Sequence, residues 1–329
     1  MKALRFIPIV ALVALSAATV TAPAGADGNH ERGGMGYFHE HPGPPGRVTT
    51  CTGTLASPGT LAGTYWSNVT VNGVCFVDAG PASVRGSLTI SPGSAVVAAF
   101  GLNDQTQSGN SSLSVAGDVV VQSGATLIMG CEPIFFTCLD DASAATGPGT
   151  LTSNGTVGGN VFGSHALAVV VHASSIGDNF ILNGGGGGQT CATPTDSPSN
   201  TPSVELWATL AQSAPYSDAE DSTVRGNEIV ANLATCWLGT ARLQIGENLV
   251  MFNNQLADPD GIEILSNTIS DNIGCWANSY VWDSSEANFG QTGLYPRTPQ
   301  PNTVGGHRFG QCVLASPTTM GGPSGPGPF

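Results

Sequence analysis

The stretch "VAGDVVVQSGATLIMG", residues 115–130, decides the fold because the chain contains close copies of it. Two are "VRGSLTISPGSAVVAAFG" (84–101) and "VGGNVFGSHALAVVVH" (157–172), and "IGDNFIL" (176–182) begins another. Each copy runs from an aliphatic residue through a Gly corner into alternating apolar residues. Alternation without a helical period predicts short β-strands, and a repeat of about 20 residues predicts strands stacked in coils.

A related pattern continues through the later half of the chain. Asn-x-Ile/Val-x-x-Asn occurs at residues 227–232, 248–253 and 267–272. We expect the central aliphatic residue to point into the core and the asparagines to form hydrogen-bonded ladders between coils. The predicted ladder residues are Asn227, Asn232, Asn248, Asn253, Asn267 and Asn272. A Gly-rich phosphate loop explains the repeat less well, because neither a helix nor a lysine follows it.

The repeats resemble those of secreted actinobacterial right-handed parallel β-helix proteins of unknown function. The resemblance runs from "GTYWSNVTVNGVCFVDAGPASVRGSLTI" to "SDNIGCWAN" and "PNTVGGHRFGQC" and covers residues 51–312. It implies an all-β, right-handed parallel β-helix (a solenoid) that is exported, and it supplies no catalytic residues. Two loop excursions depart from the pattern, at residues 131–149 and 183–222, the second with a short helix near "ELWATLAQSA". Excursions either carry binding surfaces or cap the coil.

The two ends of the chain differ in composition from the repeats. Lys2, Arg5, an apolar run and a small-residue cleavage site predict a signal peptide over residues 1–26 and a secreted, extracellular protein. Gly and Pro predict a disordered leader over 27–50 and a disordered tail over 319–329, which leaves a single β-helix domain over 51–318. No later apolar run is long enough to predict a membrane span.

The chain is strongly acidic, with 23 Asp and Glu against 9 Lys and Arg and a formal net charge of −14. Such a surface repels nucleic-acid phosphates and anionic membranes, so we expect neither as a partner. We expect a monomer.

The chain also contains 8 cysteines, an even number that predicts disulfides in an oxidising compartment. Eight cysteines permit many pairings. Their positions favour Cys51–Cys75, Cys131–Cys138, Cys191–Cys236 and Cys275–Cys312, which would tie both ends and both excursions.

The function that we expect first is a secreted, disulfide-stabilised scaffold or binding protein without an evident catalytic motif. Its partner would be a polysaccharide or a component of the cell envelope. The alternative is a polysaccharide-active enzyme, either a glycoside hydrolase or a lyase. Glycoside hydrolysis requires two carboxylates, and the candidates are Asp140, Asp141 and Asp258. Whether the chain is an enzyme stays open at this stage.

We expect no cofactor or metal, with one alternative. Asp258, Asp260 and Glu263 form an acidic turn whose oxygens suit Ca²⁺, although their spacing departs from an EF-hand loop. His165 and His172 should fall on opposite faces of a strand, which argues against a shared metal.

Two tryptophans, Trp237 and Trp276, each follow a cysteine. We expect them to pack against the disulfides rather than to stack on sugar rings.

Overall fold

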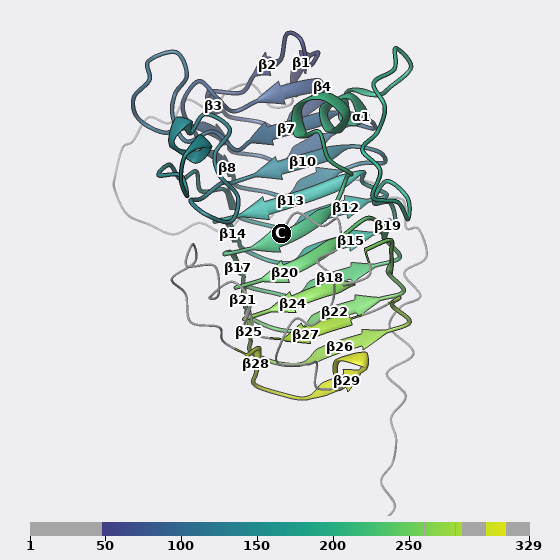
Figure 1. Cartoon of the computed structure of the whole chain (residues 1–329). Helices are drawn as coiled ribbons and strands as arrows, with labels where there is room; N and C mark the ends of the chain where they lie inside the picture. The colour runs from purple at the N-terminus through teal and green to yellow at the C-terminus, as the bar shows by residue number, and fades with distance from the viewer. Residues whose placement is uncertain (1–47, 259–260, 280, 285–300, 314–329) are drawn as a thin grey trace, which may run out of the picture. The chain divides into compact units, whose positions relative to one another are not determined.

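A computed structural model describes residues 48–258, 261–279, 281–284 and 301–313 of the chain. The chain winds through these residues as a stack of coils, and the strands of successive coils pair in parallel (Figure 1). Each coil enters three sheets in turn, which we name sheets I, II and III. All described residues belong to one unit, Gly43–Phe329. The fold is therefore a parallel β-helix, as the repeats predict.

Sheet I contains the aliphatic residue that opens each copy of the repeat. Its inward side chains, such as Val115 and Val157, are buried. In the coil that begins at Val157, the next residue is a glycine because a side chain at Gly158 would collide with the main-chain carbonyl of Ala116 in the coil before. The strands are β3 (Gly63–Tyr65), β5 (Ala82–Val84), β8 (Leu113–Val115), β11 (Thr156–Val157), β14 (Ser175–Ile176), β17 (Thr223–Val224), β21 (Gln244–Ile245), β25 (Thr268–Ile269) and β28 (Thr303–Val304).

Sheet II follows the Gly corner, and its residues alternate between the core and the outer surface. Leu88 and Ile90 are buried, whereas Thr89 between them is partly exposed. The strands are β1 (Thr49–Gly53), β4 (Val69–Phe76), β6 (Leu88–Ile90), β9 (Val119–Val121), β12 (Val161–Ser164), β15 (Phe180–Asn183), β18 (Glu228–Ala231), β22 (Leu249–Phe252), β26 (Ile273–Trp276) and β29 (Arg308–Gly310).

Sheet III completes each coil, and β4 bends from sheet II into it. Most of its described residues are buried on both faces, so something covers its outer side. Its further strands are β2 (Gly59–Thr60), β7 (Ala95–Ala98), β10 (Thr126–Met129), β13 (Ala168–His172), β16 (Ser217–Glu220), β20 (Leu238–Ala241), β24 (Ile262–Leu265) and β27 (Val281–Ser284). Two short strands, β19 (Ala234–Thr235) and β23 (Gln255–Leu256), pair at the corner between sheets II and III.

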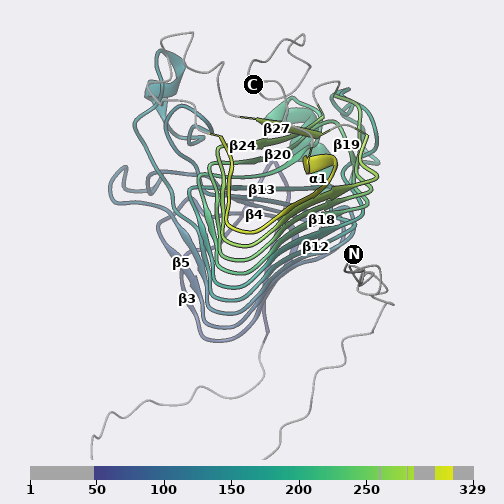
Figure 2. The same cartoon turned by 90° about the horizontal axis from the view of Figure 1, so that it is seen from below.

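Part of the cover of sheet III comes from the two excursions. The first leaves after β10, contains the 3₁₀ helix η2 (Ala142–Ala145) and returns at β11. The second leaves after β15 and contains α1 (Pro202–Glu205) and the π-helix η3 (Leu206–Ala211), where a short helix is expected. Trp207 of η3 is buried, and its Nε1 donates to Oγ1 of Thr126 on β10 over 3.0 Å. Seen along the stack, the coils superimpose (Figure 2).

The predicted end of the second excursion is wrong. Residues 217–222 belong to the coil, as β16 and the corner after it, so the excursion ends at Tyr216. Alternation explains the strand, because Ala219 points into the core while Asp218 and Glu220 point outward. The sequence does not predict a further long connection, which runs through residues 99–112 between β7 and β8.

Two asparagine ladders run along the edges of sheet II. In the first, Asn160, Asn179, Asn227, Asn248 and Asn272 succeed one another, and each Nδ2 donates to the preceding Oδ1 over 2.9–3.0 Å. In the second, Asn183, Asn232 and Asn253 are joined over 2.8 and 2.9 Å. Asn232 and Asn253 have φ of 60° and 52°, a conformation that Asn tolerates better than most residues.

The prediction that Asn267 continues the ladder of Asn227 and Asn248 is wrong, although its side chain does hydrogen-bond to the preceding coil. Asn267 lies at the corner after sheet III, where its Nδ2 donates to the main-chain oxygen of Thr240 over 2.8 Å. Asn272 instead succeeds Asn248, after 24 residues rather than the 21 that separate Asn227 and Asn248. The longer coil shifts the third copy of the pattern out of register.

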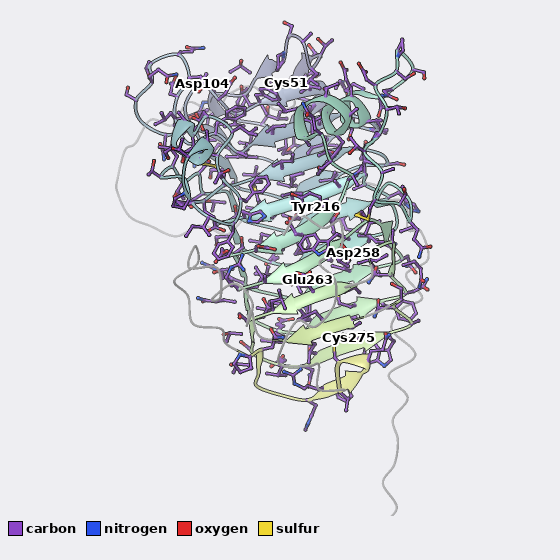
Figure 3. All side chains as sticks on the ribbon, in the orientation of Figure 1. Cys51, Asp104, Tyr216, Asp258, Glu263 and Cys275 are labelled. Atoms are coloured by element: carbon purple, nitrogen blue, oxygen red, sulfur yellow. A yellow bond between two sulfur atoms is a disulfide. The ribbon has the colours of Figure 1, made fainter. Side chains whose placement is uncertain are left out.

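Four disulfides join the pairs favoured by the sequence: Cys51–Cys75, Cys131–Cys138, Cys191–Cys236 and Cys275–Cys312. Cys51 and Cys275 mark bonds toward opposite ends of the stack (Figure 3). The first strand begins at Thr49, just before the predicted start of the domain. The predicted signal peptide, almost all of the predicted leader and the predicted tail lie outside the described residues.

Candidate functional site

Ionisable side chains gather at the corner where sheet III ends. His172 of β13 pairs in register with Glu220 of β16, and Glu220 with Ala241 of β20. Both His172 and Glu220 point outward, because each lies two residues after an outward position of its strand. The next residues, Asp221 and Arg242, have φ of 47° and 56°, which turns the chain toward sheet I. Three successive coils therefore bring a histidine, two carboxylates and an arginine together.

His172 lies between two carboxylates. Its Nε2 is 3.1 Å from Oδ2 of Asp218, and its Nδ1 is 3.5 Å from Oε1 of Glu132, which comes from the first excursion. Burial opposes a charge on the ring, but Asp218, Glu132 and Glu220 together outweigh it and raise the pKa of His172 to about 10. The ring is therefore an imidazolium, with no lone pair for a metal or for general-base catalysis.

Arg242 holds the two neighbouring carboxylates. Its Nε is 2.6 Å from Oδ2 of Asp221, and one terminal nitrogen is 2.5 Å from Oε2 of Glu220. Burial raises the pKa of Glu220 to about 8, although the charges of Arg242 and His172 oppose this rise. The guanidinium carbon lies 3.6 Å from the ring centroid of Phe135, a cation–π contact from the first excursion.

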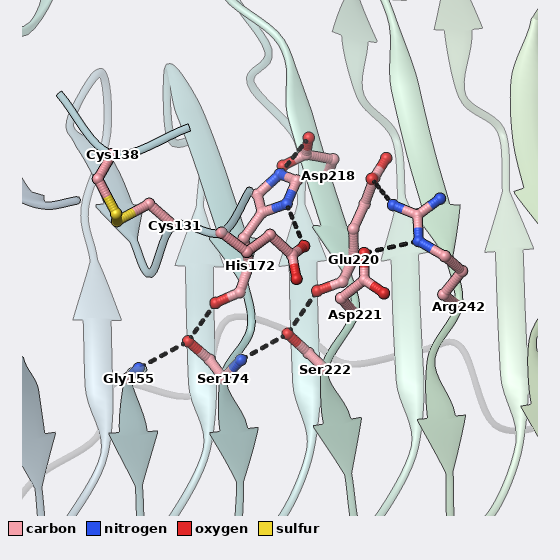
Figure 4. A network of polar contacts seen from close by, with 11 residues as sticks. Cys131, Cys138, Gly155, His172, Ser174, Asp218, Glu220, Asp221, Ser222 and Arg242 are labelled. Atoms are coloured by element: carbon pink, nitrogen blue, oxygen red, sulfur yellow. Dashed lines mark hydrogen bonds and ion pairs between the residues drawn. A yellow bond between two sulfur atoms is a disulfide. The ribbon is translucent and has the colours of Figure 1, made fainter. Parts of the chain in front are cut away.

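Side chains of the first excursion contact this cluster, which Figure 4 shows with the Cys131–Cys138 disulfide beside it. The ring of Phe136 stacks on His172, with centroids 4.6 Å apart and planes 15° from parallel. Glu132 is mostly buried, and burial, followed by the neighbouring Asp221, raises its pKa. The Cys131–Cys138 disulfide ties the two ends of the segment that carries these side chains. We name Glu132, His172, Asp218, Glu220, Asp221 and Arg242 the corner network.

Two serines fix the main chain beneath the corner network. Ser174 Oγ donates to the carbonyl of His172 over 2.6 Å and accepts from the amide of Gly155 over 3.0 Å. Ser222 Oγ donates to the carbonyl of Glu220 over 2.6 Å and accepts from the amide of Ser174 over 2.9 Å. These hydrogen bonds fix the main chain that carries His172 and Glu220. Through Glu132, the corner network also joins the first excursion to sheet III.

The sequence does not predict the corner network directly. From the sequence, His172 is paired only with His165, and Asp218, Glu220 and Asp221 fall in the expected second excursion. Aligning the corners "HAS" (172–174), "EDS" (220–222) and "ARL" (241–243) is the signal that would have found it. Glu132 has no such signal, because it approaches from a loop outside the repeat.

The catalytic candidates Asp140 and Asp141 are engaged elsewhere. The two carboxylate oxygens of Asp140 accept from the amides of Gly101 and Leu102 over 2.7 and 2.6 Å. Asp141 caps η2, and hydrogen bonds from Ser143 and then from two main-chain amides hold its pKa well below its usual range. Both residues shape the first excursion, which leaves neither carboxylate oriented as a catalytic pair.

The third candidate, Asp258, lies in the turn before β24. It is buried, its amide donates to the carbonyl of Cys236 over 3.0 Å and its own carbonyl accepts from Gly261 over 3.2 Å. Glu263 lies on the outer side of β24, in register with Gly239, and Asp260 is outside the described residues. Within the described ranges, no three His, Cys, Asp or Glu residues are grouped to hold a metal ion.

A further carboxyl is buried inside the coil. Glu228 shares the inward row of sheet II with Phe180 and Leu249, and Thr240 Oγ1 donates to its Oε2 over 2.8 Å. Burial raises its pKa to about 8, although the hydrogen bond from Thr240 opposes the rise. The side chain is therefore protonated at neutral pH. Because it is buried inside the coil, it does not reach the surface of the protein.

The inward placement of Glu228 reverses an expectation. Ile229 and Val250, at the centre of the Asn-marked repeats, point away from the core and are only half-buried, whereas Ile269 is buried in sheet I. The prediction that all three central residues face the core is wrong for the first two. Their apolar side chains lie on the outer surface of sheet II.

The two tryptophans also differ. Trp237 is buried over Gly239, in a cluster with Cys191 and Cys236, as expected. Trp276 lies over Gly274 and stays 40% exposed on the outer face of sheet II.

Among the residues that the structure describes, no helix is long and apolar enough to cross a membrane. A comparison with protein-family models, curated proteins and solved structures finds no match to this chain.

Proposed function

We propose that the chain is a secreted, disulfide-stabilised β-helix scaffold that binds an extracellular partner without cleaving it. The corner network carries this proposal. Its histidine and arginine are each held by two carboxylates beneath Phe135 and Phe136, and His172 is 1% exposed. An active site requires groups that reach a substrate and change protonation during turnover, and the buried, paired side chains of this network are suited to neither.

Secretion is supported by the covalent structure. Disulfides persist in oxidising compartments, and small-residue cleavage signals follow the apolar start of the chain. The similarity of the repeats to secreted actinobacterial β-helix proteins is a further reason to propose export. Extracellular polymers, a polysaccharide above all, are then the partners within reach. The net charge of −14 disfavours anionic ones.

The test is a panel of plant, fungal and bacterial polysaccharides, incubated with the purified protein with and without Ca²⁺. We expect co-sedimentation with at least one neutral polymer and no soluble oligosaccharide by mass spectrometry. We also expect an unchanged melting temperature with Ca²⁺. Released oligosaccharides would overturn the proposal. A Ca²⁺-dependent melting temperature that disappears in Asp258→Asn would revive the calcium site.

The second candidate is a polysaccharide-active enzyme, and one observation favours it. Glu220, with a pKa of about 8, lies on the same strand as Asp218, two residues away on the same outer face. Glycoside hydrolysis uses a pair of neighbouring carboxyl groups, one as the acid and the other as the base or nucleophile. If products appear, Glu220→Gln and Asp218→Asn should abolish them, and Asp140→Asn should not.

A further inference from the structure

We propose that the outer face of sheet II is the binding surface, and that it takes one chain of an uncharged polysaccharide laid along the stack. This inference rests on the binding function proposed above and names its site and ligand class. The strands concerned, β12, β15, β18, β22 and β26, lie one above the next in Figure 1.

One column of outward side chains crosses this face in register. It begins with threonines and becomes apolar at β9, so the C-terminal part of the column is a hydrophobic strip. At β26 the position in register is Gly274. Trp276, which is itself in register with Phe252, lays its ring over Gly274 and so continues the strip. The strip consists of Val120, Phe162, Ile181, Ile229, Val250, Trp276 and Phe309.

The strip is exposed and uncharged. Phe162, Trp276 and Phe309 are 37%, 40% and 37% exposed. In the described strands of sheet II, no outward position carries a charged side chain; Glu228 points inward and Arg308 lies in the inward row beside Ile273. The net charge of −14 disfavours anionic ligands, and these strands present no outward carboxylate that would bind a cationic one.

The edge of the strip offers hydrogen bonds. Asn183, Asn232 and Asn253 form an exposed ladder there, and side-chain amides both donate to and accept from hydroxyl groups. Aromatic rings can pack against the C–H faces of sugars, and a row of amides can hydrogen-bond to their hydroxyl groups. The strip and its ladder therefore match the two kinds of surface on a polysaccharide. A purely apolar partner would leave these amides without new partners.

Dimensions favour a single chain over a second copy of the protein. From β9 to β29 the strip spans seven strands, about 30 Å, and its strands are about 13 Å long, which gives about 400 Å². A stable protein interface buries about 800 Å² per partner. Two copies would also repel each other through their like net charge. A linear polymer needs only the width of the strip.

The reach of the strip predicts a dependence on ligand length. Phe162 on β12 and Trp276 on β26 are four strand spacings apart, about 19 Å. A hexasaccharide can touch both rings and a disaccharide cannot.

The experiment measures binding of cellohexaose, chitohexaose and the matching disaccharides by calorimetry, and co-sedimentation with amorphous cellulose and chitin. We expect Ile229→Asp and Trp276→Ala to weaken binding by about tenfold or more. Ile229→Thr, which keeps a β-branched residue in the strand, should weaken it less. The matched controls Leu139→Asp and Leu210→Asp change exposed leucines of the two excursions and should leave binding unchanged. Circular dichroism checks that each variant is folded.

Three outcomes would overturn the inference. Loss of binding only in Leu139→Asp or Leu210→Asp would place the site on an excursion and leave the proposed binding function intact. A wild-type dimer in sedimentation that Ile229→Asp dissociates would make a second copy the occupant. Binding of none of these neutral polymers would exclude the ligand class. Release of oligosaccharides would contradict the proposed function itself, and mass spectrometry of the supernatant separates that case.

Discussion

Sheets II and III are built from the same alternating pattern, yet their outer faces differ completely. Val170 on the outer side of β13 has no exposed surface, whereas Phe162 on the outer side of β12 is 37% exposed. Sheet III is covered by excursions that bring Trp207, Phe135 and Phe136 over its strands. Sheet II lies bare between two asparagine ladders. In this solenoid the loops, and not the strands, decide which face is available.

The largest expected effect comes from opening the covered face. Arg242→Ala would leave Glu220 and Asp221 buried without their cation. We expect a loss of about 3–5 kcal/mol in the free energy of unfolding, measured with urea. The control Arg225→Ala, at an exposed corner, should cost less than about 1 kcal/mol. Similar small losses in both variants would mean that sheet III is as open as sheet II.

The two tryptophans compare the faces directly. Trp237→Ala removes a buried ring beside Tyr216 and should cost about 3 kcal/mol or more in the free energy of unfolding. Trp276→Ala removes a ring from the bare face and should cost less than about 1 kcal/mol. Thermal and urea unfolding of both variants provide the measurement. A reversed order would contradict the assignment of covered and open faces.

The pH dependence of stability should come from buried groups, in sheet III and inside the coil. His172 has a pKa raised from 6.5 to about 10, and Glu220 and Glu228 have pKa values raised from 4.5 to about 8. In each case the folded state holds the proton more tightly than the unfolded state. The free energy of unfolding should therefore fall as pH rises, from 4.5 through about 8 for the carboxyls and from 6.5 through about 10 for the histidine.

The measurement is urea unfolding at about pH 5, 7 and 9. A difference of one in pKa between the folded and unfolded states is worth about 1.4 kcal/mol, so we expect the free energy of unfolding to fall by at least about 4 kcal/mol. Glu228→Gln should flatten the part of the fall below about pH 8, because it removes one raised carboxyl without touching the surface. A stability that rises over this range would contradict the buried, paired state of the corner network.

The smallest effect is expected at the border of the open face. Asn248→Ala removes the oxygen that accepts from Nδ2 of Asn272 over 2.9 Å and the donor to Asn227. We expect a loss of about 1–2 kcal/mol in the free energy of unfolding. Asn253→Ala, in the exposed ladder, should cost less. Equal losses would mean that the two ladders contribute alike.

The repeats predict the fold, the strand pairing and the ladders, because each coil repeats the same sequence pattern. They do not predict the phase of the alternation in sheet II. Sequence logic places Ile229 inward and Glu228 outward, and a shift of one residue exchanges the two faces. The structure buries Glu228 as a carboxylic acid, which leaves Ile229 on the surface and creates the strip.

The corner network could not be predicted from the sequence, for a different reason. Its members come from four separate segments, and Glu132 and Phe136 approach from a loop whose path no period describes. The aspartates chosen instead, Asp140 and Asp141, looked available because their partners are main-chain amides of other turns. Acidic residues that fix a loop cannot be told from catalytic ones by spacing alone.

Hydroxyl-radical footprinting of the native protein, read residue by residue with mass spectrometry, tests the difference between the two faces most directly. We expect rapid oxidation of Phe162, Trp276 and Phe309, approaching that of the highly exposed Trp66, and protection of Trp207 and Trp237. Oxidation of Trp207 and Trp237 as fast as that of Trp276 would show that sheet III is open, and would contradict the difference between the two faces.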